Sequence, residues 1–334
     1  MENIDTSYIR EPVDRGLLLQ ELKQRHFLRK TNYGDKEIYV TTAHSSPNIM
    51  QEIGRLRELS FALDGGGTGK PVDIDEYDLL PEPHCYKQLF VWSPHDREIV
   101  GAYRFIHGTN ILQRPDGTYA TSAASEFHFS DEFVSDYLPF TVELGRAFVQ
   151  PMFQPGNNLS KGLYSLDNLW DGLGALVAKY ENIRYFFGKV TMYTGYNSRA
   201  RNILLNFLHK YFPDPEHLVT ASHPLDFNLN DPYISSLFEG LEYKDALKVL
   251  QKELKANGEN IPPLIHSYMN LSPSMKVFDT AINDFFGGVE ETGILIKISD
   301  IYPEKIDRHV KPILKWALDT KNKWWRKLKK RTNR

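Results

Sequence analysis

The chain has 334 residues, which exceeds the usual size of one domain, so either one large domain with an extension or two domains are expected. Its composition, with 41% apolar and 25% charged residues, is that of an ordinary globular protein, and the net charge of −3 singles out no class of partner. The one cysteine, Cys85, excludes an intrachain disulfide, and no run approaches the roughly 18 apolar residues of a transmembrane helix.

The first 40 residues read as a lead-in with one helix at about 17–27. A second helix is predicted over 47–63, because apolar residues recur there at helical spacing. It ends at the glycine-rich run 64–69, which is too flexible to continue a helix. The apolar residues of the second helix are Ile49, Ile53, Leu56, Leu59 and Leu63.

The middle of the chain is predicted to alternate strands and helices. Residues 88–92 and 99–106 have the pattern of a β-hairpin, joined by the turn-forming residues 93–98. A polar excursion follows. The next predicted elements are a strand at 141–149, a helix at 166–180, a strand at 185–192 and a helix at 198–211. This order predicts a mixed β-sheet with helices on its faces, which is an α+β fold in α/β/α layers.

The sequence changes in character after Pro213, where prolines recur around an amphipathic helix at 243–257 and a late strand at 293–298. We therefore expect four parts. They are an N-terminal lead-in (1–40), a core (41–214), a C-terminal α/β extension that packs on the core (215–318) and a basic aromatic tail (319–334).

The segment Thr141–Pro151 is the most unusual feature, because it reads as a buried strand yet contains Glu143, Gly145 and Arg146. Buried charges are costly unless they are paired, so these residues form either an ion pair that serves the fold or part of a functional site. Residues three apart on a regular strand point to opposite faces. Both charges can therefore face one site only if a bulge forms at Leu144–Arg146, where the glycine permits it.

Two polar segments are further candidates. The loop 150–162 can aim backbone N–H groups at a phosphate, or it can be an ordinary surface connection, and it lacks the spacing of a Walker loop or a dinucleotide fingerprint. Its candidate residues are Gly156, Asn157, Ser160 and Gly162. The acidic segment 73–78 can bind a cation or an amine, or it can be a solvated loop. Its carboxylates are Asp73, Asp75, Glu76 and Asp78.

Two arginines stand among apolar residues, Arg57 in the helix at 47–63 and Arg104 near the end of a strand. Each can clamp a carboxylate or phosphate with two parallel hydrogen bonds, or it can form a structural ion pair. The histidines and the single cysteine do not have the spacing of a zinc site, so no metal is expected.

Five short motifs, taken in order, resemble one family. They are Arg57-xxx-Phe61, Asp75-Glu-Tyr-Asp78, Val100-Gly-xx-Arg104, Glu126-Phe127 and Glu143-Leu-Gly-Arg146. Their order and spacing resemble the N-acyl amino acid synthases of the N-acetyltransferase (GNAT) superfamily, often labelled hemolysin-like, which make the lyso forms of ornithine and glycine lipids. The acyl-homoserine-lactone synthases are more distantly similar. The resemblance continues through 169–173, 186–190 and 261–265, and it covers roughly residues 45–310.

The resemblance implies a GNAT-like mixed sheet flanked by helices. It also implies an enzyme that moves a long-chain (3-hydroxy)acyl group from an acyl-carrier-protein or coenzyme A thioester to the α-amine of an amino acid, as the first step of aminolipid synthesis. No bound cofactor is implied. The block 166–173 favours glycine over ornithine as the acceptor, and the loop 150–162 lacks the pyrophosphate motif of coenzyme A enzymes, which favours a carrier protein. The alternatives are a synthase of acyl-homoserine-lactone-like signals and a non-enzymatic, membrane-active protein of the hemolysin type.

The resemblance also assigns roles. Glu143 would accept the proton of the acceptor's ammonium group, with Arg146 and Arg104 as catalytic partners. The acyl–pantetheine arm would lie where the strand 141–149 splays from the strand 185–192. The implied substrate-binding residues are Arg57, Phe61, Asp75, Asp78 and Glu126, and the implied acyl-donor loop contains Gly156, Asn157, Ser160 and Gly162.

The tail Lys321–Arg334 holds eight Lys or Arg residues and no acid, with Trp324 and Trp325 among them. It can anchor the chain on an anionic membrane surface, bind an acidic carrier protein, or be a disordered tail. No nucleic acid partner is expected. Because the N-terminus lacks the basic and apolar regions of a signal peptide, we expect a cytoplasmic protein, or one peripheral to the inner face of the cell membrane.

Overall fold

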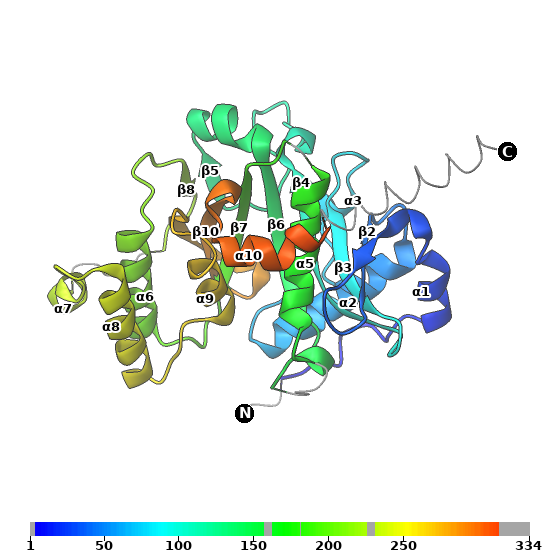
Figure 1. Cartoon of the computed structure of the whole chain (residues 1–334), viewed down its shortest axis with the longest axis horizontal. Coiled ribbons are helices and arrows are strands. Elements are labelled where there is room, and N and C mark those ends of the chain that lie inside the picture. Colours follow the sequence, from blue (N-terminus) through cyan, green and yellow to red (C-terminus); the bar gives the residue numbers. More distant parts are fainter. Residues whose placement is uncertain (1–3, 157–161, 181, 226–230, 314–334) are drawn as a thin grey trace, which may run out of the picture.

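The computed structural model describes residues 4–156, 162–180, 182–225 and 231–313. Within these residues the chain forms an eight-stranded sheet in the order β1-β2-β3-β4-β6-β7-β10-β9 (Figure 1). Its neighbouring strands are antiparallel, except that β6 and β7 run parallel. The strands are β1 (Phe27–Lys30), β2 (Glu37–Thr41), β3 (Lys87–Ser93), β4 (Glu98–His107), β6 (Thr141–Val149), β7 (Tyr185–Met192), β9 (Lys276–Asn283) and β10 (Val289–Lys297).

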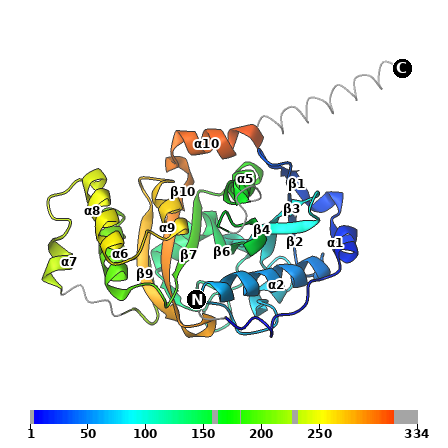
Figure 2. The same cartoon turned by 90° about the horizontal axis from the view of Figure 1, so that it is seen from below.

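Helices cover both faces of the sheet, which makes the α+β fold in layers that the sequence predicts. Figure 2 shows α2 (Pro47–Leu63) on one face, with α5 (Ser165–Lys179) and α10 (Pro303–His309) on the other. A short pair, β5 (Phe127–Phe129) and β8 (Val219–Ala221), forms a second sheet. The other α-helices of the described chain are α1 (Arg15–Glu21), α3 (Glu76–Leu79), α6 (Ser198–Tyr211), α7 (Pro232–Ser236), α8 (Tyr243–Ala256) and α9 (Pro263–Met269).

The helix α2 spans the residues predicted for it, because its sequence contains both a start and a stop. Pro47 stands in the first turn, where its missing N–H is not needed. Gly65 and Gly67 follow the last turn with positive φ angles, which glycine adopts without strain. The buried residues Ile53 and Leu56 of this helix pack in one cluster with residues of the sheet.

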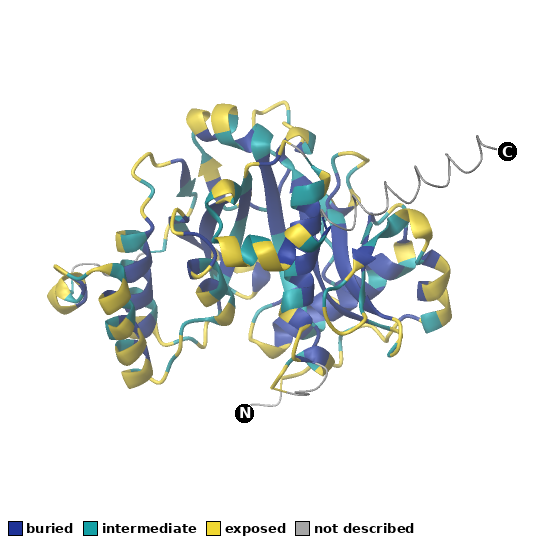
Figure 3. Ribbon diagram, viewed as in Figure 1, coloured by how far each residue is buried: buried dark blue, intermediate teal, exposed yellow. Residues whose placement is uncertain are grey.

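The alternation of side chains along the strands separates two cores. On the α5 face, Val142 and Leu144 of β6 pack in one cluster with Leu169 and Leu173. A bulge between Gly145 and Phe148 shifts the alternation by one residue, so Phe148 of β6 lies on the α2 face and packs with the apolar side of that helix. Figure 3 shows the central strands as the most buried part of the molecule. Because alternate residues of a strand share a face, the charged Glu143 faces away from the α5 core.

The parallel pair β6–β7 separates part of the way along its length, as expected from the resemblance. The two strands pair only from Thr141↔Tyr185 to Leu144↔Gly188, although β6 continues to Val149 and β7 to Met192. An opening therefore forms beyond Leu144, with β6 on one side and β7 on the other.

A β-bulge lies at the same point on the other edge of β6. The pairs Ala102↔Phe148 and Arg104↔Gly145 leave two residues of β6, Arg146 and its neighbour, opposite one residue of β4. Arg146 has a φ of 48°. The bulge predicted at Leu144–Arg146 is thus confirmed, with the left-handed conformation taken by the arginine and not by the glycine.

Several elements differ from the sequence predictions. The helix predicted at 17–27 is α1, which ends at Glu21, because Phe27 instead begins an edge strand and pairs with Tyr39. The late strand predicted at 293–298 is β10, and it begins at Val289. In the range expected for the C-terminal extension, β9 and β10 continue the central sheet beside β7. The predicted boundaries between the four parts stay predictions.

Candidate active site

A cavity of about 780 Å³ lies at the opening between β6 and β7. Its charged and polar lining comes from the α2-facing side of the sheet and includes Arg104, Ser122, Glu143, Arg146, Lys189 and Glu291. Its apolar lining includes Phe61, Ala147, Met192, Tyr196, Ile261 and Phe286. One cavity thus offers charged groups and a hydrophobic surface at the point where the sheet opens.

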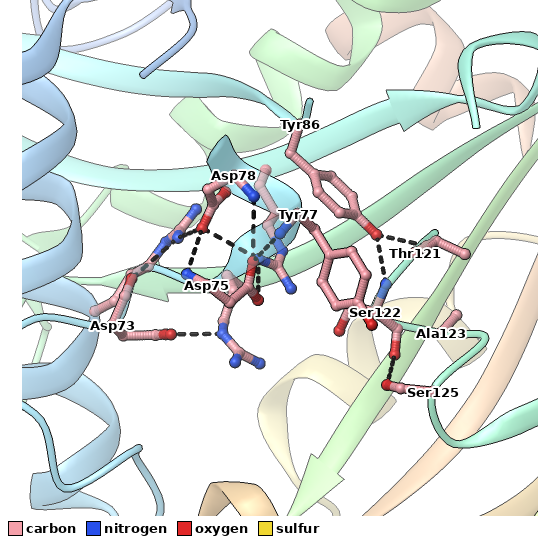
Figure 4. Close-up of polar contacts among 12 residues, drawn as sticks. Asp73, Asp75, Tyr77, Asp78, Tyr86, Thr121, Ser122, Ala123 and Ser125 are labelled. Atoms are coloured by element: carbon pink, nitrogen blue, oxygen red, sulfur yellow. Dashed lines mark hydrogen bonds and ion pairs between the residues drawn. The ribbon is translucent and has the colours of Figure 1, made fainter. Parts of the chain in front are cut away.

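Glu143 is held in one orientation by three donors. The Tyr86 hydroxyl donates to Oε1 at 2.5 Å, the backbone N–H of Ala123 donates to the same oxygen at 3.2 Å, and the Thr121 hydroxyl donates to Oε2. The glutamate is only 3% exposed. Figure 4 shows Tyr86 beside Thr121 and the neighbouring Ser122, whose N–H donates to the tyrosine hydroxyl at 3.1 Å. These donors fix the orientation of the Glu143 side chain at the wall of the cavity.

Arg104 lies at the wall of the same cavity with one edge paired and one edge unpaired. Its Nη1 donates to Asp75 at 2.6 Å and to Asp78 at 3.2 Å. Its guanidinium lies 4.4 Å from the centroid of the Tyr86 ring. Among the described residues, Nε and Nη2 are buried and have no hydrogen-bond partner. Those two atoms form the edge that binds a carboxylate with two parallel hydrogen bonds.

The charge of Arg104 is secured by its neighbours. Burial alone would lower the pKa of this guanidinium, but the carboxylates of Asp75 and Asp78 outweigh burial and raise the pKa well above its ordinary value. The effect is mutual. Burial alone would raise the pKa of Asp75, but Arg104 and Arg146 hold it at about 2. The ion pairs therefore persist through the physiological pH range.

Arg57, Asp75 and Asp78 lie behind the cavity and do not line it. Arg57 and Asp78 are fully buried and form an ion pair of 3.0 Å. Gln88 completes this group, because it accepts from Arg57 Nη2 at 2.5 Å and donates to Asp78 at 2.8 Å. Asp75 caps the N-terminus of α3 and contacts Arg104. Asp75 and Asp78 hold Arg104 in place, and Arg57 in turn holds Asp78. Direct contact of these three residues with a substrate stays a prediction.

Arg146 reaches the cavity because of the bulge, and its partner is Asp73 and not Glu143. Its Nε lies 2.7 Å from Asp73 Oδ2, and its guanidinium lies 4.1 Å from the centroid of Phe286. Burial alone would lower the pKa of Arg146, but the carboxylates of Asp73, Asp75 and Glu291 together raise it above its ordinary value. Phe61 packs edge-on against Phe286 and also lines the cavity. Of the two alternatives for Glu143 and Arg146, a mutual ion pair is therefore not the one that forms.

Lys189 and Glu291 are cavity residues that the sequence analysis missed. Lys189 Nζ lies 2.5 Å from Glu291 Oε2, and it also forms an ion pair with Glu126. Asn283 donates to Glu126 at 2.7 Å and to Glu291 at 3.2 Å. The signal was the one that identified Glu143, namely a charge inside an apolar strand, and it is present in both 185–192 and 289–297. Glu126 lies in this cluster, beside the cavity.

The predicted acyl-donor loop is described in part. Asn157 and Ser160 lie outside the described residues, as does the basic tail Lys321–Arg334. Gly156 is exposed, and Gly162 packs so closely that an added Cβ would lie 2.4 Å from the nitrogen of Pro155. The binding of a donor by this loop stays a prediction.

The described residues contain neither a metal-binding cluster nor a membrane-spanning helix. No group of three or more His, Cys, Asp or Glu in this part of the chain is arranged to hold a metal ion. Among the helices described, none is both long enough and apolar enough to cross a bilayer.

A sheet that opens between two parallel strands, beside a bulge and a cavity, is the arrangement that the resemblance to the GNAT superfamily implies. Residues 56–162 match the acetyltransferase (GNAT) domain family. The class defined by the fold and the site is therefore a GNAT acyltransferase.

Two relatives narrow the class. The chain is 48% identical over 304 residues to a protein of Bacteroides thetaiotaomicron named glycine N(alpha)-acyltransferase, covering 91% of this chain and 90% of that protein. It is 47% identical to a protein of the same name from Phocaeicola vulgatus, over 91% of this chain and 93% of that protein. The chain belongs to the family of these proteins, and it is an acyltransferase.

Proposed function

We propose that the chain transfers a long-chain acyl group, such as a 3-hydroxyacyl group, from a thioester to the α-amine of glycine, as the first step of aminolipid synthesis. The observation that carries this proposal is the unpaired edge of Arg104 beside the carboxylate of Glu143, at the wall of one cavity. A buried guanidinium N–H without a partner is costly, and a carboxylate is the ligand that fits this edge. The names of the two relatives support glycine as the acceptor.

The space beside Arg104 suits a small acceptor. Gly145 pairs with Arg104 across the β4–β6 ladder, and a Cβ added to the glycine would lie 3.4 Å from Arg104 Nε. The acceptor's carboxylate would bind to Nε and Nη2 of the arginine. Its amine would then face Glu143, which lies two residues before Gly145 on β6 and on the same face.

The reaction follows from these positions. An ammonium group is not nucleophilic, so Glu143 first removes a proton from it, directly or through a water. The amine nitrogen attacks the thioester carbonyl carbon, the C–N bond forms and the C–S bond breaks. The nitrogen loses two protons in all, of which one goes to the departing thiolate and one to solvent. Beyond Leu144, β6 no longer pairs with β7, so backbone N–H groups on that edge of β6 are available. They would stabilise the oxyanion of the tetrahedral intermediate.

The donor proposed is an acyl-carrier-protein thioester, with coenzyme A as the alternative carrier. Its pantetheine arm would enter the opening between β6 and β7, and its acyl chain would lie on the apolar lining, which includes Ile261 and Leu264. The loop 150–162 lacks a pyrophosphate motif, which supports the carrier protein. The basic tail Lys321–Arg334 would bind the acidic carrier or an anionic membrane, with the protein in the cytoplasm or peripheral to the inner face of the cell membrane.

The test is a reconstituted reaction. Purified protein is incubated with a hexadecanoyl or 3-hydroxyhexadecanoyl thioester of carrier protein, or of coenzyme A, and with glycine, alanine, serine or ornithine. Mass spectrometry of the products reads the acceptor and the acyl chain together. We expect N-acylglycine and free thiol, with the carrier-protein thioester the better donor. The absence of any amide product from this panel would refute the proposal, and a lactone product would favour the signal synthase.

A further inference from the structure

The cluster of Lys189, Glu126, Glu291 and Asn283 is a second group of buried charges at the cavity. The carboxyl groups of Glu126 and Glu291 both contact the one ammonium group of Lys189. A cluster of this kind is costly to bury, and perturbed charges in a cleft mark functional sites.

The position of Glu291 in the sheet brings it to the cavity from the side of β7 that is remote from β6. Along β7, Phe187 is the ladder neighbour of Glu143, and Lys189 and Thr191 follow on the same face. Glu291 of β10 is the ladder partner of Thr191. Glu143 and Glu291 therefore flank β7 on one face of the sheet, and both line the cavity.

The two oxygens of Glu291 are held unequally. Oε2 contacts Lys189 Nζ at 2.5 Å and accepts from Asn283 at 3.2 Å. Oε1 accepts a long hydrogen bond of 3.4 Å from the Thr191 hydroxyl. Two strong contacts thus fix the carboxylate, and its other oxygen is the more easily given to a ligand.

Glu291 carries the negative charge of the cluster. Burial and the neighbouring Glu291 raise the pKa of Glu126 to about 9, so Glu126 is protonated at neutral pH. Burial alone would raise the pKa of Glu291 as well, but Lys189, the hydrogen bond with Glu126 and Arg146 together lower it below its ordinary value. A carboxylate with a low pKa is a weak base and a good partner for a cation. The role that follows for Glu291 is distinct from that of the proton acceptor, which is proposed for Glu143.

We propose that Glu291 binds the ammonium group of the acceptor. This inference rests on the proposed function and names a second anchor for the same substrate. Arg104 holds the carboxylate of the amino acid, Glu291 accepts one N–H of its ammonium group, and a second N–H points to Glu143. Lys189 and Asn283 act as positioning residues that orient Glu291. The site thereby selects a molecule with an amine and a carboxylate on the same carbon atom.

The test compares Glu291→Gln with Glu290→Gln in steady-state kinetics. Glu290 is the adjacent carboxylate on the same strand, points to the opposite face, and pairs with Arg201. We expect Glu291→Gln to raise the KM for glycine roughly 10- to 100-fold, as for loss of a hydrogen bond between charged groups, and to leave the KM for the donor thioester unchanged. Glu290→Gln should keep the wild-type KM for glycine.

A second probe separates the anchor from general damage to the site. Glycolate has the carboxylate of glycine and a hydroxyl in place of the ammonium group, so its inhibition constant should be unchanged in Glu291→Gln. Equal weakening of glycine and glycolate, or a glycine KM like that of Glu290→Gln, would overturn the inference while the proposed function stood. If the wild-type protein makes no N-acylglycine, the proposed function fails and this inference fails with it. Should Glu291→Gln not fold, Glu291→Asp serves, with a several-fold higher KM for glycine and unchanged inhibition by glycolate.

Discussion

Glu143 is a buried side chain with three hydrogen-bond donors and a cavity beside it. A substitution of the same shape can therefore test its catalytic role without removing its packing. Glu143→Gln keeps the shape of the side chain and removes the basic oxygen. We expect kcat to fall about 10²- to 10⁴-fold, which is the usual contribution of a general base. Thermal unfolding measured on the same sample checks that the fold survives. A turnover near that of the wild type would exclude Glu143 as the base.

Arg104 separates charge from geometry. Arg104→Lys keeps a cation next to Asp75 and Asp78 but loses the Nε and Nη2 edge. We expect kcat/KM for glycine to fall roughly 10- to 100-fold. The control is Lys248→Arg on α8, where the lysine is exposed and pairs with Asp245. This change should leave kcat/KM unchanged. If Arg104→Lys has the wild-type kcat/KM, the arginine does not bind the acceptor's carboxylate.

Glu126 gives the protein a pH-dependent stability. Its pKa is raised to about 9 in the folded state from an ordinary value of 4.5, so the folded chain binds more protons than the unfolded chain between those values. Stability from this group is therefore complete below about pH 4.5 and is lost as pH rises towards 9. In Glu126→Gln the free energy of unfolding should fall less between pH 6 and pH 9 than in the wild type. Urea denaturation at both pH values measures the free energy of unfolding. The same change of this free energy with pH in the two proteins would contradict the assignment.

At the scale of elements, the bulge in β6 decides what the cavity can hold. Gly145 has no special φ requirement, so Gly145→Ala should fold, but its new methyl group would stand 3.4 Å from Arg104 Nε. We expect the KM for glycine to rise several-fold while the unfolding temperature changes little, because the methyl narrows the place proposed for the acceptor's carboxylate. A matched control is Gly195→Ala, at another point of the cavity lining, where an added Cβ meets nothing within 4 Å. A KM for glycine unchanged by Gly145→Ala would place the carboxylate elsewhere.

The sequence predicted the elements whose signal is local. The helix α2 was predicted to the residue because its apolar spacing, first-turn proline and terminal glycines lie within the element itself. The edge strands β1 and β9 and the strand β2 beside β1 were missed, because segments with mixed polarity become strands only by pairing with other parts of the chain. The bulge was predicted because Glu143 and Arg146, three residues apart, can face one site only if the strand is bulged between them.

The site was predicted in the same uneven way. Glu143, Arg146, Arg104 and Phe61 line one cavity, and the roles that the resemblance implies for them stay predictions. Asp78 lies behind Arg104 and pairs with it, and Arg57 pairs with Asp78. Asp73, Lys189 and Glu291 gained their importance from tertiary neighbours, since Arg146 meets Asp73, and Lys189 meets Glu291, only after the sheet has formed. Spacing along the chain carries no trace of such pairs.

At the scale of the whole molecule, the C-terminal extension and the core are joined by one sheet. Eight consecutive residue pairs connect β10 to β7, and β10 supplies Glu291 to the cavity. A chain cut after residue 214 would leave β7 as an open edge with unpaired backbone groups and an uncovered apolar surface, which favours aggregation. We therefore expect residues 1–214 to be insoluble or to lack a cooperative thermal transition, whereas residues 1–313 should unfold cooperatively near the temperature of the full chain. Calorimetry of the three lengths measures this. A folded, monomeric 1–214 fragment would show that the core is an independent domain, and its activity with carrier-protein thioester and glycine would show whether the site needs β10 at all.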